Sequence, residues 1–198
     1  MATLAAQLDL FIIPKPPASS LLVLEAHASS EYRPRTLANA HAADVTVAFA
    51  VDFNTAGERL TARVAGRRYL AIAYDTNPAI AAEALLAKLR QAAASVLNVA
   101  GNGIYTLKTA GHTQADANAW VYAVLKQVLV HTNLTCIRSG GQTGIDQAGL
   151  VSAVALGIPA VGLLPKGYRQ RLADNRDVDR DVAELRREIL QQARILES

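Results

Sequence analysis

Apolar runs alternate with amphipathic stretches along most of the chain. The continuous, β-branched run Val45–Val51 is typical of a strand that is buried on both faces. Shorter apolar runs predict five further strands, at Leu21–Leu24, Tyr69–Tyr74, Ser95–Ala100, Thr135–Ile137 and Ile158–Leu164. Helical spacing predicts helices at 56–64, from Pro78 onward, at 115–131, after 144 and at 178–196. In the helix at 56–64, Leu60 and Val64 are expected to face inward. This alternation predicts an α/β fold, a three-layer sandwich with a mostly parallel sheet.

Four polar loops follow predicted strands. They are Asp52–Glu58, Asn98–Asn102, Ser139–Asp146 and Pro165–Tyr168. Ligands of parallel sheets bind beyond the carboxyl ends of the strands, so we expect these loops to converge on one site.

The loop Ser139–Asp146 reads Ser-Gly-Gly-Gln-Thr-Gly-Ile-Asp and lies between a predicted strand and a predicted helix. Such a loop directs backbone N–H groups and the positive end of a helix dipole at one point, where an anion fits. The expected ligand residues of this loop are Ser139, Gly140, Gly141, Gln142, Thr143, Gly144 and Asp146. Thr143 and Asp146 also have the spacing of a capping box, so Asp146 either caps the helix or binds ribose hydroxyls.

Residues of the other loops complete the expected site. Lys166, followed by Gly167, is placed to balance phosphate charge, or is a solvated loop lysine. Arg35 and Asn39 are four residues apart, so on a helix they share a face. Arg35 binds a carboxylate or phosphate of the ligand, or it forms a salt bridge with Asp44 or another surface acid. Glu58 is the one candidate for acid–base chemistry, although a glutamate often simply begins a helix. The remaining expected ligand residues are Thr55, Gly57, Asn98, Gly101 and Asn102.

Several chemistries are disfavoured by the motifs. Gly144 is not followed by Lys-Ser/Thr, and Gly101-Asn102-Gly103 lacks the third glycine of a dinucleotide fingerprint, so we expect neither ATP hydrolysis nor hydride transfer to NAD. The four histidines lack metal-ligand spacing. The single cysteine, Cys136, excludes an intrachain disulfide and is expected in the core. We expect binding rather than catalysis.

Composition adds few constraints. The chain of 198 residues is 51% hydrophobic and 19% charged, as in globular domains. Its net charge of +3 permits a nucleic-acid-binding surface but does not indicate one. We see no transmembrane run and no signal peptide, and the lack of a thiol framework favours the cytoplasm.

Residues 1–20 are expected to be an appendage to a single domain at 21–198. The Pro-rich stretch Ile12–Ser20 behaves as an extended spacer. Before it, Gln7-Leu8-Asp9-Leu10-Phe11 resembles the motif with which bacterial proteins bind the sliding clamp. Two leucines and a phenylalanine suit apolar pockets, and the glutamine suits a hydrogen bond at their entrance. The alternative is that this peptide packs on its own domain.

Several segments together resemble the molybdenum-carrier family of the SLOG superfamily, which comprises nucleotide sensors, LOG enzymes and DNA-processing proteins. The matching segments are Leu24–Tyr32, Arg35-Thr36, Asn39, Ala43–Thr46, Leu97–Gly101, Gly103–Tyr105, Ser139–Asp146 with its helix to Pro159, and Pro165–Gly167. That family begins with the glycine loop, whereas here the loop comes last, so the chain resembles a circularly permuted member.

The resemblance implies a Rossmann-like fold, a homodimer and a nucleotide-derived or phosphorylated ligand, with molybdenum cofactor as one alternative. Ala56-Gly57-Glu58 replaces the family's Gly-Gly-Thr turn, and the loop after Gly101 is shortened to Asn102, which leaves the identity of the ligand open. Two further alternatives remain open. One is hydrolysis of nucleotide N-glycosidic bonds, as in LOG enzymes, and the other is a DNA-metabolism accessory role with clamp recruitment.

Overall fold

The computed structural model describes residues 17–198, which form a six-stranded, all-parallel sheet in the order β1-β6-β5-β4-β2-β3. The strands are β1 (Leu22–Ala26), β2 (Val45–Ala50), β3 (Tyr69–Ala73), β4 (Val96–Gly101), β5 (Cys136–Ser139) and β6 (Ala160–Leu164). The expected α/β fold with a parallel sheet is confirmed, and each predicted strand is present.

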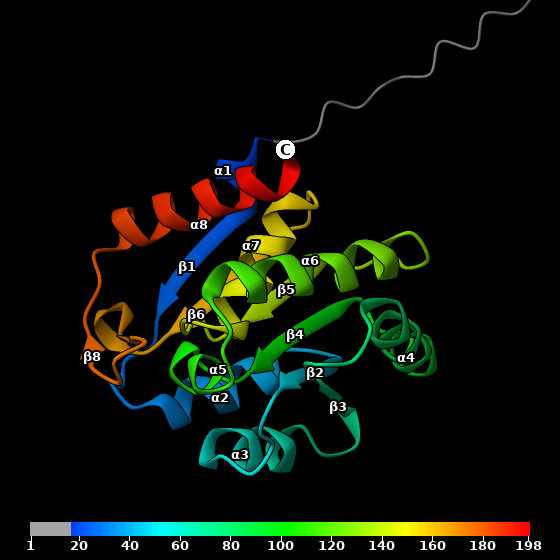
Figure 1. Ribbon diagram of the computed structural model, residues 1–198, viewed down its shortest axis with the longest axis horizontal. Coiled ribbons are helices and arrows are strands. Elements are labelled where there is room, and N and C mark those ends of the chain that lie inside the picture. The colour runs from blue at the N-terminus through cyan, green and yellow to red at the C-terminus, as the bar shows by residue number, and fades with distance from the viewer. Residues whose placement is uncertain (1–16) are drawn as a thin grey trace, which may run out of the picture.

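Helices cover both faces of this sheet, giving the three-layer, Rossmann-like arrangement (Figure 1). On one face lie α2 (Tyr32–His41) and α3 (Ala56–Ala65), which pack against each other. On the other lie α4 (Pro78–Gln91), α6 (Gln114–Leu129), α7 (Ile145–Ala155) and α8 (Val182–Glu197). The shorter elements are α1 (Ala18–Leu21), η1 (Gly66–Arg68), α5 (Ile104–Thr109), η2 (Lys166–Tyr168) and the hairpin β7 (Gln170–Arg171) and β8 (Asp177–Val178).

Burial follows from these layers. All six residues of β2 are buried, because helices cover both of its faces. All eleven residues of α7 are buried as well, because α7 packs against α6, α8 and the strands β4, β5 and β6. Asp146 and Gln147 are among these buried residues, and both have polar side-chain partners inside the protein.

Two helices differ from the sequence-based expectation, α5 in its presence and α8 in its extent. The short helix α5 was not predicted, although Ile104 and Leu107 are buried on one side of it. Helix α8 begins at Val182 rather than at 178, because Asp177–Val178 pair with β7 and Asp181 accepts the N–H of Glu184 as its N-cap.

The buried face of α3 also differs from the one expected from the sequence. Its buried residues are Glu58, Thr61 and Ala65, whereas Leu60 and Val64 are half-buried. The apolar residues of this helix thus do not mark the side that faces the sheet, and a polar side is buried instead.

The direction of chain progression reverses between β2 and β4. From β2 the chain crosses through α3 to the edge strand β3, and then returns through α4 on the opposite face to β4. The loops that follow β2 and β4 therefore diverge, and they leave a crevice at the carboxyl edge of the sheet. In open α/β sheets such a reversal is the usual place for a ligand.

Two further expectations concern other parts of the chain. The Gln7–Phe11 peptide lies outside the described residues. Among residues 17–198, no helix has the length and apolar character needed to cross a membrane.

Candidate functional site

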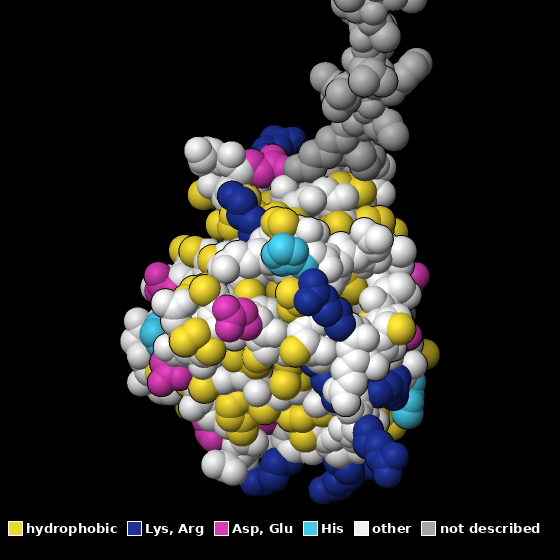
Figure 2. All heavy atoms as spheres, turned by 90° about the vertical axis from the view of Figure 1, so that its right-hand side faces the viewer, with side chains coloured by type: hydrophobic (Ala, Val, Ile, Leu, Met, Phe, Trp, Pro, Cys, Tyr) yellow, Lys and Arg dark blue, Asp and Glu magenta, His cyan; other side chains and the backbone are white. Residues whose placement is uncertain are grey.

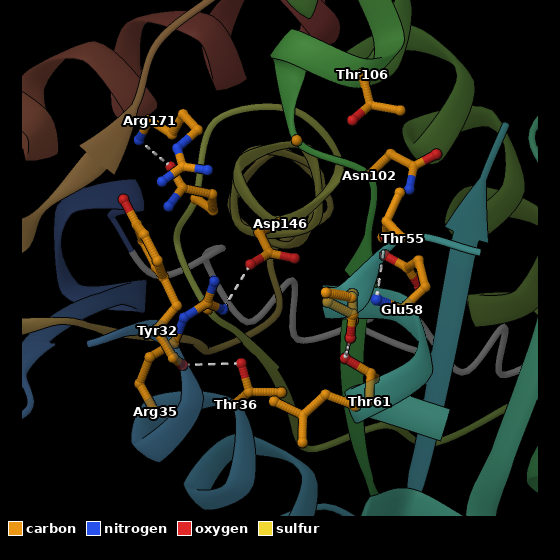
Figure 3. A pocket seen from close by; sticks show the side chains of 18 of the residues that line it. Tyr32, Arg35, Thr36, Thr55, Glu58, Thr61, Asn102, Thr106, Asp146 and Arg171 are labelled. Atoms are coloured by element: carbon orange, nitrogen blue, oxygen red, sulfur yellow. Dashed lines mark hydrogen bonds and ion pairs between the residues drawn. The ribbon is translucent and has the colours of Figure 1, made fainter. Parts of the chain in front are cut away.

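A cavity of about 430 Å³ occupies the crevice between β2 and β4. Its walls come from α2, the first turns of α3 and α5, the end of β4, the glycine loop and β7. Ala100 and Gly140 are among its lining residues, and such small residues leave the space that larger side chains would fill. Segments that are far apart in the sequence meet here, as Figure 3 shows.

An ion pair lies at the centre of this view (Figure 3). Arg35 of α2 donates from Nη1 to Asp146 Oδ2 of α7 at 2.8 Å, and their side chains are only 12% and 6% exposed. Burial raises the pKa of the Asp146 carboxyl, while Arg35 and the N–H groups of Gln142 and Gly101 oppose that rise. A side chain at Gly140 would overlap the Arg35 guanidinium, since an added Cβ would lie 1.4 Å from Nη1. Glycine is thus required where the guanidinium crosses the loop.

Glu58 provides a second buried carboxyl in the cavity wall. It is 4% exposed, and its Oε2 has no hydrogen-bond partner. Burial raises the pKa of Glu58 to about 8; the nearby carboxylates of Asp146 and Asp52 add to the rise and Arg35 opposes it. Glu58 is therefore mostly protonated at neutral pH, and it presents an O–H donor instead of a negative charge.

Two more buried polar atoms beside the cavity lack partners. They are Asn98 Oδ1, on β4, and Arg35 Nε. The amide nitrogen of Asn98 donates to Thr46 Oγ1 at 3.3 Å, so the carbonyl oxygen is the end that stays unpaired. Buried polar groups in folded proteins nearly always have partners, so each of these atoms requires an explanation.

Several N–H groups at the glycine loop and at the start of α7 have partners within the protein. Gly144 donates to Gln114 Oε1 at 2.6 Å, Ile145 donates to the Asn102 carbonyl, and Gln147 donates to the Gln142 carbonyl. The Asp146 carboxylate already lies beside the N-terminus of α7. The loop thus offers an incoming phosphate fewer free donors than its sequence led us to expect.

The capping-box interpretation of Thr143 is wrong. The N-cap of α7 is Gly144, whose φ of 93° is left-handed and favours glycine. Thr143 instead donates its hydroxyl to the Arg171 carbonyl. Asp146 is free of a capping role and pairs with Arg35.

Side chains of the C-terminal region hold the glycine loop in place. Gln142 Oε1 accepts the N–H of Arg171, and the buried Gln170 donates to the Gly141 carbonyl at 2.7 Å. Gln147 donates to Glu188 and Gln192 of α8. This part of the loop therefore acts as an attachment for β7 and α8.

The structure brings most of the expected site residues together and leaves some outside. Those that line the cavity are Arg35, Asn39, Thr55, Gly57, Glu58, Asn98, Gly101, Asn102, Gly140, Gln142 and Asp146. Those that do not line it are Ser139, Gly141, Thr143, Gly144, Lys166 and Gly167. Of the four loops expected to converge, Pro165–Tyr168 contributes no lining residue, and the Lys166 N–H donates to the Ser29 carbonyl.

Other expectations for single residues also change. Asp44 does not pair with Arg35; its carboxylate accepts the N–H groups of Ser95 and Val96. Asn102 lines the cavity, but its side chain bonds Val51 N–H, Asp52 N–H and the Asp52 carbonyl, so it is a structural bridge. Cys136 is half-buried rather than fully buried.

Sequence reasoning missed several lining residues. They are Tyr32, Arg33, Thr36, Thr61, Thr106 and Arg171, among others. Tyr32 and Arg171 lie on one side of the Arg35–Asp146 pair, and Thr55 and Glu58 lie on the other (Figure 3). Thr61 and Glu58 are three residues apart and share a helical face, which was the one available signal.

The region that contains the glycine loop is similar to a known family. Residues 137–184 match the model of the circularly permuted YpsA SLOG family. The expected relationship to SLOG proteins, in permuted order, is thereby confirmed. The matched segment runs from β5 through the glycine loop and β7 to the start of α8.

The SLOG match includes Asp146 and Arg171 but ends before most of α8, and it does not extend to α2 and α3. Neither a curated protein nor a solved structure matches the chain. The permuted SLOG match therefore covers one wall of the cavity, and the chemistry of the opposite wall rests on the geometry described above.

Among residues 17–198, no group of three or more His, Cys, Asp or Glu side chains is arranged to hold a metal ion. The described polar groups at the cavity are instead two carboxyls, three guanidiniums, several amides and several hydroxyls. These groups suit hydrogen bonding to an organic ligand.

Proposed function

We propose that this protein binds a nucleotide-derived, anionic small molecule in the cavity between α2, α3 and α7. The observation that carries the proposal is the set of buried, unpartnered atoms at the cavity: Arg35 Nε, Glu58 Oε2 and Asn98 Oδ1. Arg35 Nε is a donor, the protonated Glu58 carboxyl can donate, and Asn98 Oδ1 is an acceptor. Together they match the mixture of hydrogen-bond donors and acceptors on a nucleotide. The SLOG match supports the same class of ligand.

Charge supports an anionic ligand. Arg33, Arg35 and Arg171 line the cavity, against the carboxyls of Asp146 and Glu58. Because Glu58 is mostly protonated at neutral pH, the lining is net positive. The first turn of α3, at Ala56 and Gly57, also contributes the positive end of a helix dipole. We propose that the ligand's phosphate lies at this turn rather than on the glycine loop.

A thermal-shift panel of nucleosides and nucleotides tests the proposal. We expect a nucleotide to raise the melting temperature, since a ligand at 100 times its Kd adds about 2.7 kcal/mol to the free energy of unfolding. Asn98→Ala should weaken this response. Asn133→Ala, at an exposed position before the amino end of β5, is the matched control and should leave the response unchanged. If no nucleotide shifts the melting curve and none co-purifies with the protein, the proposal is wrong.

Mass spectrometry of the co-purifying material separates the two ligand alternatives. A nucleotide supports the proposal as stated. A phosphorylated pterin would instead support the molybdenum-carrier alternative, which rests on the resemblance of the sequence to that family.

A second candidate function is hydrolysis of a nucleotide N-glycosidic bond, and Glu58 is the observation that favours it. In that reaction water adds to C1′ of the ribose as the bond from C1′ to the base breaks. A carboxyl that is protonated near neutral pH is suited to donate the proton that the leaving base takes up, and water returns a proton to it.

Release of free base from nucleoside monophosphates tests this candidate. Glu58→Gln should abolish release while nucleotide binding persists. Glu83→Gln, on the exposed face of α4, is the matched control and should retain the rate. Binding without any base release would leave the first proposal standing alone.

A further inference from the structure

A second depression, of about 310 Å³, adjoins the cavity on the outer side of α2 and α3. It is lined by Arg33, Ala56, Arg59, Leu60 and Arg63. Three of these residues, Arg33, Ala56 and Leu60, also line the cavity. The two hollows therefore lie side by side at the N-terminal part of α3.

The arginines of this depression differ from those near the glycine loop. Arg33, Arg59 and Arg63 are exposed, and none of them forms an ion pair or a side-chain hydrogen bond with another described residue. By contrast, Arg35, Arg171 and Arg180 are each paired with a carboxylate. The depression thus holds three positive charges that the described part of the protein leaves uncompensated.

This clustering opposes helix stability. Arg59 and Arg63 are four residues apart on α3, and like charges at that spacing destabilise a helix by a few tenths of a kcal/mol. The one acidic residue within α2 and α3 is Glu58, which faces the cavity. Figure 2 shows Lys and Arg side chains gathered toward the lower end of the molecule, at the level where Figure 1 places α3.

We propose that this depression is a second anion subsite for the ligand of the cavity, and that the ligand carries a chain of two or more phosphates. This inference rests on the proposed function. The first phosphate lies at the first turn of α3, and the terminal phosphate lies between Arg59 and Arg63, with Arg33 beside both hollows. The ligand class is therefore a nucleoside di- or triphosphate rather than a monophosphate.

The shape of the hollow favours a small molecule over a nucleic-acid strand. The depression spans residues 56 to 63 of α3, about two helical turns, and it adjoins the cavity, with which it shares three lining residues. A single strand bound for its backbone charge requires a groove that continues over several nucleotides.

Titration calorimetry with adenosine mono-, di- and triphosphate and with inorganic tripolyphosphate tests the subsite. We expect the triphosphate to bind about tenfold tighter than the monophosphate, as two exposed charge-assisted contacts would give. The double variant Arg59→Ala, Arg63→Ala should lose that tenfold difference and should lose tripolyphosphate binding. The double variant Arg90→Ala, Arg187→Ala removes the same charge from exposed positions of α4 and α8 and should keep both.

The outcomes separate the two proposals. If monophosphate and triphosphate bind the native protein equally, or if both double variants respond alike, the subsite is wrong and the proposed function stands. If no nucleotide binds but tripolyphosphate binds and depends on Arg59 and Arg63, the subsite stands and the proposed function fails. Binding of single-stranded DNA that depends on the same arginines, without any nucleotide preference, would overturn the small-molecule assignment.

Discussion

Two strand–loop–helix junctions lie at the cavity, and they use their helix N-termini differently. At the glycine loop, Gly144, Ile145 and Gln147 donate their N–H groups to other parts of the protein. At the first turn of α3, Thr55 caps the N–H of Glu58, while Ala56 and Gly57 line the cavity. Several N–H groups of the glycine-rich junction thus already have partners, whereas the first turn of α3 faces open space.

A glycine-rich sequence by itself therefore does not identify a phosphate-binding loop. Gly140 allows the Arg35 guanidinium to cross the loop, and Gly144 lies against the Asn102–Ile104 backbone. Both serve close packing. Gly57, by contrast, has open space where its side chain would be. Its lack of a side chain leaves the α3 turn accessible to a ligand.

The largest expected effect is at the buried ion pair on the glycine-loop side. Asp146→Ala should lower the free energy of unfolding by about 3–5 kcal/mol, because it leaves the Arg35 guanidinium buried and unpaired. Urea denaturation measures this change. Asp179→Ala, which breaks the exposed pair with Arg169, should cost less than about 1 kcal/mol. Equal losses for the two variants would show that the buried pair has no special role.

The next effect concerns the α3 side and depends on pH. The pKa of Glu58 is raised from 4.5 to about 8, so the folded protein binds a proton more tightly than the unfolded chain. The stabilisation that this proton provides is therefore present in full below pH 4.5 and is lost as the pH rises to about 8. Between these two pH values the free energy of unfolding should fall by roughly 1.4 kcal/mol per pH unit. Glu58→Gln should flatten this dependence, as measured by denaturation at pH 5.5 and 7.5, and a parallel slope in both proteins would contradict the raised pKa.

Matched glycine substitutions compare the two junctions directly. Gly144→Ala should destabilise the protein by about 1–3 kcal/mol, since the residue has a positive φ and an added Cβ would lie 2.5 Å from the Asn102 carbonyl oxygen. Gly57→Ala should be neutral or stabilising by up to about 1 kcal/mol, because the position is helical and open. Thermal denaturation measures both, and a loss at Gly57 as large as at Gly144 would remove the contrast.

The smallest effect is at the cap of α3. Thr55→Ala removes the acceptor for the Glu58 N–H and should cost about 1 kcal/mol. Thr55→Ser keeps the acceptor and should retain most of that stability. If both variants lose the same amount, the capping bond contributes little.

Local pattern was sufficient to predict the sheet. The β-branched run that became β2 and the apolar run that became β4 identify strands without any knowledge of their neighbours. The glycine loop was also located correctly, between β5 and α7. Each of these features depends on residues that are adjacent in the sequence.

The contacts within the site could not be predicted in the same way. Arg35 and Asp146 are 111 residues apart, and nothing in either local sequence identifies its partner. The buried side of α3 carries Glu58 and Thr61 because a cavity, rather than the apolar core, lies against it. Arg171 reaches the site through a two-residue strand, which is too short to give a periodic signal.

The two ends of the described chain lie away from the cavity. In Figure 1, helix α1 and the C-terminal end of α8 are both at the same end of the molecule, and Arg186, in the N-terminal part of α8, donates to the Ser19 carbonyl. The cavity opens at the opposite, carboxyl edge of the strands. A fusion partner, an affinity tag or a surface attached at either end of residues 17–198 would therefore leave the mouth of the cavity facing solvent, ready for ligand measurements on the immobilised protein.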